Sequence, residues 1–165
     1  MPTFTQIGSA VTVGAGGAAS IDFTSIPSTY TDLVLKVSAR GTGSAQYIKV
    51  SFNGSTTGFT GRQISGNGST ASSGSFPPLI FEINRSTYTA STFANCEAYI
   101  PNYAGSSNKS YSGDSVNENN ASTAFMTMVA GLWSNTAAIT SISLTCDAGN
   151  FDQYSTAYLY GVSNA

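Results

Sequence analysis

Charged residues are scarce in this chain of 165 residues. Asp, Glu, Lys and Arg make up 8% of it, against about 25% in ordinary soluble domains, and the formal net charge is -2. Binding to nucleic acid or to an anionic membrane surface relies on clustered Lys and Arg, and the six basic residues here are scattered. The composition therefore predicts no nucleic-acid partner, no membrane partner and a neutral polar surface.

Histidine is absent altogether, which removes the commonest general base and the commonest metal ligand. The glycine-rich segment 14–20, GAGGAAS, precedes a strand pattern and not the helix that a phosphate-binding loop requires. The segment 147–152, DAGNFD, lacks the residue order of a calcium loop. We therefore expect no enzyme activity, no metal and no cofactor. Four carboxylates that could suggest glycoside hydrolysis are expected to be solvated: Glu82, Glu97, Asp114 and Glu118.

Long apolar runs are also missing. No stretch approaches the roughly 18 apolar residues of a membrane span, and the opening MPTFTQIGSAVTVG has no basic, apolar leader typical of export. The two cysteines, Cys96 and Cys146, alternate in phase with apolar neighbours, so both thiols should point into a core. Without an export signal, reduced thiols are favoured over the alternative of a disulfide.

What the chain does have is apolar alternation with a period of two, broken by turns rich in Gly, Asn and Ser. This pattern predicts an all-β fold: a jelly-roll-like antiparallel β-sandwich in a single domain, residues 1–165, with a short N-terminal arm at about 1–6. The expected strands are 4–13, 18–24, 31–40, 46–53, 59–65, 79–84, 92–100, 123–133, 139–146 and 155–162.

Three polar regions receive other assignments. Residues 66–75 are expected to form a long loop, as is the segment around Asp114, where the capping-box sequence SVNE at 115–118 leaves one helical turn as an alternative. In the strand 31–40 the apolar residues should face inward. The other face carries Asp32, Lys36 and Arg40, too few and too mixed in charge for a site, so it should be a plain outer wall.

Aromatic residues in or beside turns are the remaining lead. They could stack on sugar rings or anchor a protein interface, or they could close the ends of the core, and the pattern favours neither. With two residues of the N-terminal arm, the candidate interface residues are Pro2, Phe4, Tyr30, Tyr88, Tyr103, Tyr111, Phe151 and Tyr154.

Several segments together carry a resemblance over about residues 7–162: GGAASIDFTSIPSTYTDLVLKVSARG, YIKVSFNGS, AYIPNYAGSSNKSYSGDSVNENN, AGLWSNTAAITSISLT and STAYLYGVS. The chain resembles small virion proteins of tailed bacteriophages and domains within phage fibres. The resemblance implies a β-sandwich structural module without catalysis.

A capsid decoration, or cement, protein is the first function that the resemblance implies. Such a protein would assemble in the host cytoplasm and lie on the capsid surface of the virion. It would dock on the major capsid protein at capsomer junctions, as a homotrimer. The alternative is a fibre or receptor-binding head that recognises host-surface carbohydrate. A fibre usually adds a long repetitive shaft, and its absence from this sequence favours decoration.

Overall fold

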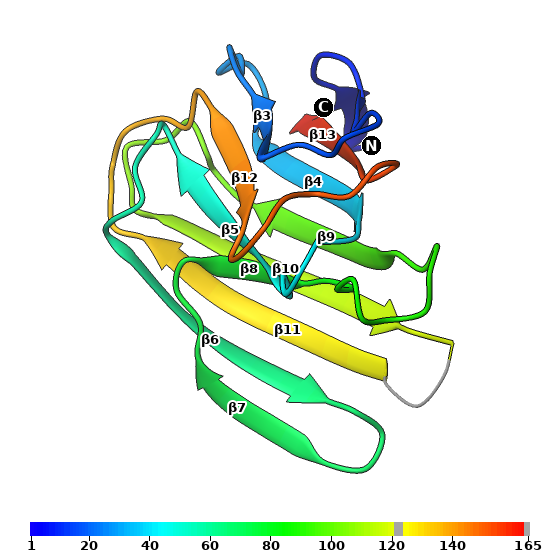
Figure 1. Cartoon of the computed structure of the whole chain (residues 1–165). Helices are drawn as coiled ribbons and strands as arrows, with labels where there is room; N and C mark the ends of the chain where they lie inside the picture. The colour runs from blue at the N-terminus through cyan, green and yellow to red at the C-terminus, as the bar shows by residue number, and fades with distance from the viewer. Residues whose placement is uncertain (121–123, 164–165) are drawn as a thin grey trace.

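A computed structural model describes residues 1–120 and 124–163. Two antiparallel sheets pack face to face in it, and the described residues contain no helix (Figure 1). The predicted all-β, single-domain antiparallel sandwich is confirmed. The chain alternates between the sheets along much of its length, as in a jelly roll, although the two sheets differ in size.

The large sheet has nine strands among the described residues. Its spatial order is β1 (Thr3–Gln6), β13 (Thr156–Ser163), β4 (Asp32–Ala39), β9 (Ala94–Ile100), β10 (Lys109–Glu118), β11 (Ala124–Trp133), β6 (Phe59–Gly66) and β7 (Ala71–Ser75), and β2 (Val11–Thr12) also pairs with β13. The small sheet has the order β3 (Ser20–Phe23), β12 (Ile142–Cys146), β5 (Tyr47–Phe52) and β8 (Leu79–Glu82).

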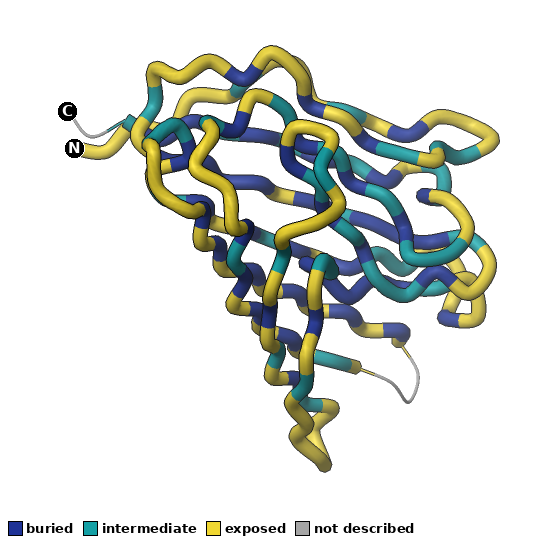
Figure 2. Tube along the Cα trace, turned by 90° about the vertical axis from the view of Figure 1, so that its left-hand side faces the viewer, coloured by how far each residue is buried: buried dark blue, intermediate teal, exposed yellow. Residues whose placement is uncertain are grey.

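The core lies between the inner faces of the two sheets. On β4, Leu33 and Leu35 are fully buried, and Ile48 and Leu144 of the small sheet join them in one apolar cluster. Complete burial of a side chain of this size contributes about 1.5–3 kcal/mol. Figure 2 shows the consequence of the period of two: buried and exposed residues alternate along the strands.

An aromatic cluster closes one part of this core. Phe52 of β5 packs edge-on against Trp133 and Tyr111, with ring centroids 5.6 and 5.9 Å apart. The ring of Tyr111 lies directly over Gly131 of β11, where a Cβ atom would come within 2.0 Å of the tyrosine ring. The aromatic cluster therefore requires glycine at position 131.

The inner faces become polar near the end of β8. Glu82, predicted to be solvated, is instead buried, and its carboxylate accepts hydrogen bonds from Gln46 Nε2 at 3.1 Å and Thr127 Oγ1 at 2.9 Å. Ser115 Oγ, on β10, accepts a bond from the backbone N–H of Glu82. A buried carboxylate is tolerated because these donors replace water.

Two strands were missed because they carry no apolar alternation. The segment predicted as a loop or helical turn around Asp114 is β10, and the predicted loop 66–75 contains β7. Both have serine-rich sequences, KSYSGDSVNE and ASSGS, and their pairing with neighbouring strands is what defines them. The predicted strand 123–133 is present as β11 from Ala124, and residue 123 lies outside the described residues.

The N-terminal arm does not project freely. Its residues Thr3–Gln6 form β1, which pairs with β13 from Thr3↔Ser163 to Gln6↔Tyr160. All four side chains of β1 remain exposed. The arm is therefore an edge strand of the large sheet, and β1 and β13, which are far apart in the sequence, lie side by side (Figure 1).

Both cysteines are free and buried, Cys96 on β9 and Cys146 on β12, as predicted. Burial raises the pKa of both thiols, that of Cys146 to about 12.

We predict that a thiol reagent at pH 8 labels neither Cys96 nor Cys146 in the native protein and labels both after unfolding, because the reactive thiolate is scarce and shielded. The time course is followed by mass spectrometry. Fast labelling of the native protein, or a mass two daltons lower before reduction, would contradict this assignment.

Candidate functional site

The outer face of the large sheet is not covered by other described residues across its centre. Strand register aligns one outward row across five strands: Lys36, Glu97, Asp114, Met128 and Ile64. Four of these residues are exposed and Glu97 is half-buried. The row changes from charged on β4, β9 and β10 to apolar on β11 and β6.

Apolar side chains gather at the second half of this row. Val116, Met126, Met128 and Ile64, hereafter the apolar patch, are 43, 68, 69 and 65% exposed. The register joins them, because Val116 pairs with Met126 and Met128 pairs with Ile64 on neighbouring strands. Contiguous exposed apolar residues on a polar surface mark interaction sites, whereas scattered ones need no explanation.

Charges of opposite sign flank the apolar patch. On one side Lys36 forms a salt bridge with Glu97, and Asp114 lies between Glu97 and the patch. The hydrogen bond to Glu97 raises the pKa of Lys36, and burial followed by the charge of Glu97 raises the pKa of Asp114. On the other side lies Arg62 of β6, whose Nη1 donates a hydrogen bond to Ser75 Oγ at 3.2 Å. The surroundings of Asp114 therefore disfavour its charged form.

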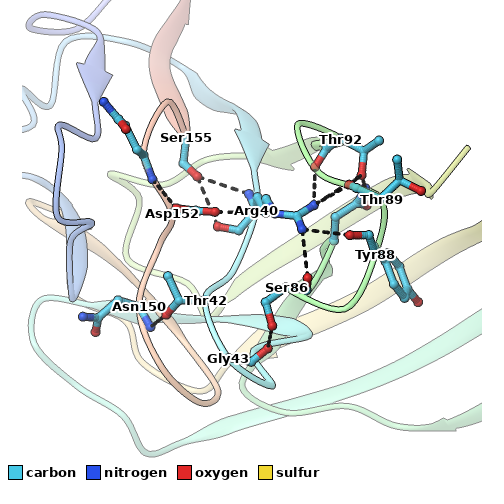
Figure 3. A network of polar contacts seen from close by, with 12 residues as sticks. Arg40, Thr42, Gly43, Ser86, Tyr88, Thr89, Thr92, Asn150, Asp152 and Ser155 are labelled. Carbon is cyan, nitrogen blue, oxygen red and sulfur yellow. Dashed lines mark hydrogen bonds and ion pairs between the residues drawn. The ribbon is translucent and has the colours of Figure 1, made fainter.

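A second polar feature lies at the end of β4, around Arg40. The prediction that Arg40 belongs to an exposed outer wall is wrong, because its side chain is buried. Its guanidinium donates to backbone carbonyls of the loop 85–92 (Figure 3): Nη1 to Thr89 O at 2.9 Å and Thr92 O at 3.1 Å, Nη2 to Ser86 O at 3.1 Å and Tyr88 O at 3.0 Å. One side chain therefore fixes the backbone of a whole loop.

Arg40 also binds the loop 147–155 on its other side. Its Nε lies 3.5 Å from Asp152 Oδ2, its carbonyl accepts the Asp152 N–H at 2.8 Å, and its own N–H donates to Ser155 Oγ at 3.1 Å (Figure 3). Sequence reasoning missed this role because an Arg in an alternating strand is indistinguishable from a solvated one until the loops are placed.

Most of the aromatic residues predicted at turns close the core and are unavailable to a partner. Tyr103 and Phe151 are fully buried, and Tyr88 and Tyr111 are nearly so. Tyr30 is half-buried, with its ring over Gly161. The prediction that Tyr111 lies at a turn is wrong, because it lies on β10 and packs in the core against Phe52; the other four rings, near the strand ends, help to cover the apolar interior.

Three of the predicted interface residues are exposed: Pro2, Phe4 and Tyr154. The structure does not bring them into the apolar patch, which consists of residues that the sequence did not single out. The sequence signal for the two methionines of the patch is the run AFMTMV, in which apolar residues occupy both faces of β11.

The described residues hold no group of three or more His, Cys, Asp or Glu able to bind a metal ion. None of the described segments is a helix long and apolar enough to cross a membrane. Glu97 and Asp114, the acids paired across β9 and β10, lie on the open sheet face and not in an enclosing cleft.

We predict that Arg40→Lys lowers the free energy of unfolding by about 3 kcal/mol, because one ammonium cannot reach the carbonyls that the guanidinium holds. Arg62→Lys, the same change at an exposed position, should stay within about 0.5 kcal/mol of the wild type. Urea unfolding measures both, and hydrogen exchange should accelerate at 86–92 only in the Arg40 variant. Equal stability of the two variants would refute the role of Arg40.

We predict that Asp114→Asn raises the urea midpoint at pH 7. A folded-state pKa above the unfolded one means that stability falls as the pH rises through these two values and the carboxylate ionises. Asn avoids that penalty. Below about pH 3, where Asp is protonated in both states, the two midpoints should converge. A lower midpoint for the variant at pH 7 would contradict the desolvation of Asp114.

Comparisons of the chain with protein families, curated proteins and solved structures find no match.

Proposed function

We propose that this protein is a non-enzymatic virion structural protein that decorates the capsid of a tailed bacteriophage. The observation that carries the proposal is the apolar patch on the outer face of the large sheet. The patch lies on a broad, regular sheet face between flanks of opposite charge, which suits docking against another protein surface. The occupant is the major capsid protein, with an apolar surface whose charged flanks are reversed.

The scarcity of charge supports the same role. Decoration places many copies of one protein side by side on a particle, and a net charge of -2 keeps their mutual repulsion small. The resemblance to small virion proteins of tailed phages is a further support, and it adds the capsomer junction as the site of attachment.

A homotrimer fits this arrangement. Capsids offer threefold and quasi-threefold positions, where a trimer repeats one docking contact at each subunit. After the first contact forms, the others form at high effective concentration, so weak contacts add to firm attachment. Attachment across capsomers favours the assembled shell by mass action.

We predict that the double variant Met126→Ser, Met128→Ser binds particles of its own phage at least tenfold more weakly. Burying a Met side chain fully contributes about 1.5–3 kcal/mol, and each 1.4 kcal/mol is a factor of ten in affinity. Because both residues are exposed, the free energy of unfolding should change by less than about 0.5 kcal/mol per residue. Co-sedimentation with particles stripped of the protein measures the attachment.

The matched control is Tyr154→Ala, which removes an equally exposed side chain outside the apolar patch and should sediment like the wild type. A reconstruction of the particle should place the protein at capsomer junctions. Density confined to the tail tip would replace decoration by the fibre alternative, and unchanged sedimentation of the double variant would exclude the apolar patch as the docking face.

A further inference from the structure

A surface hollow of about 430 Å³ lies between the loop 85–93 and the segment 152–154. Its lining includes Arg40, Ser86, Ser91, Asp152, Gln153 and Tyr154. The volume falls within the range of about 300–1,000 Å³ typical of small-molecule sites. The apolar patch on β10, β11 and β6 shares no residue with this hollow, so the two features are separate.

The backbone at the hollow is strained at two places. Tyr154 has φ +71° and Ser91 has φ +63°, in the left-handed region that non-glycine residues rarely adopt. Each such residue costs about 1 kcal/mol or more, and strain of this kind clusters at binding sites. The N–H of Tyr154 donates to Val13 O at 2.9 Å, which holds the strained backbone in place.

This backbone presents the ring of Tyr154 to solvent. The residue is 67% exposed, whereas the other tyrosines predicted at turns close the core. A large ring at the rim of a hollow, carried by a backbone that a hydrogen bond holds in place, offers an apolar platform with a polar tip.

Around the platform stand hydrogen-bonding groups. The carboxylate of Asp152 is 43% exposed on its side chain, and its position is fixed by Arg40 Nε at 3.5 Å and by the N–H of Gln153 at 2.8 Å. Gln153 adds an amide and Ser91 adds a hydroxyl group, whereas the hydroxyl of Ser86 already donates to the carbonyl of Gly43. These groups both donate and accept, as a ligand with several hydroxyls requires.

An anionic ligand does not fit this hollow. The two Nη atoms of Arg40 are already engaged with four carbonyls and its Nε faces Asp152, so the guanidinium has its donors occupied. The guanidinium and the carboxylate of Asp152 that it pairs with carry no net charge together, so the hollow offers an anion neither a free guanidinium donor nor a net positive charge. A neutral ligand with a flat apolar face and polar edges remains.

From these contacts we propose that the hollow binds a neutral pyranose, a single hexose unit of a saccharide. The C–H face of the sugar stacks on the ring of Tyr154, and its hydroxyls donate to the carboxylate of Asp152 and exchange hydrogen bonds with Gln153. Arg40 is a positioning residue, because it fixes both loops and touches the ligand through neither of its Nη atoms. The site does not depend on the decoration role.

The test uses saturation-transfer difference NMR on the whole chain with four probes: the methyl glycosides of glucose, galactose, N-acetylglucosamine and rhamnose. The wild type should transfer saturation to the ring protons of at least one of them. For that probe, Tyr154→Ala should weaken binding at least tenfold, and Tyr154→Phe, which keeps the ring, should stay within threefold of the wild type.

The variant Met126→Ser, Met128→Ser should bind the glycoside like the wild type, so the failure of the docking face and the failure of the saccharide site are distinguishable. Tyr154→Gly checks the fold independently: it relieves the left-handed backbone, so its melting temperature should equal or exceed that of the wild type while glycoside binding is lost. No transfer to any of the four probes, or equal binding by Tyr154→Ala, would overturn the proposal.

Discussion

The apolar contact between two sheets of unequal width is the interaction on which the rest of this structure depends. The small sheet covers the inner faces of β4 and β9 and so buries Leu35 of β4 and Cys96 of β9. Beyond its reach the side chains of β7 are almost entirely exposed, and small polar residues are the ones that tolerate solvent on both faces. The difference in width therefore explains why serine dominates one edge of the large sheet.

Polar groups replace apolar packing where the core ends. Glu82 is held by Gln46 and Thr127 inside the sandwich, and Arg40 holds the loops that extend past β4. Loops with little apolar content would otherwise be ordered only by their own backbone, at a cost of about 1–2 kcal/mol of conformational entropy per residue. Arg40 offsets that cost by replacing water at several carbonyls at once.

How much the sequence could predict depends on which force defines each element. The apolar alternation of β4, β9 and β13 reports burial directly, so these strands and the inward Cys96 were predictable. In β10 the buried residues include Ser115 and Asn117, and because these are polar the sequence shows no apolar alternation there. Pairing with β9 and β11 is what defines this strand. The apolar patch could not be predicted for a similar reason: from the sequence alone Met126 and Met128 could face either side of the sheet, and the pairing of β11 with β6 decides which.

The pairing of the first strand with the last has a consequence for how the protein is made. β13 also lies between β1 and β4, so β4, one of the most buried strands, lacks one neighbour until Thr156–Ser163 has been synthesised. Such long-range pairing gives a high contact order, for which closure takes about milliseconds to seconds. A growing chain on the ribosome therefore leaves the backbone edge of β4 unpaired until β13 emerges, and the large sheet closes only then.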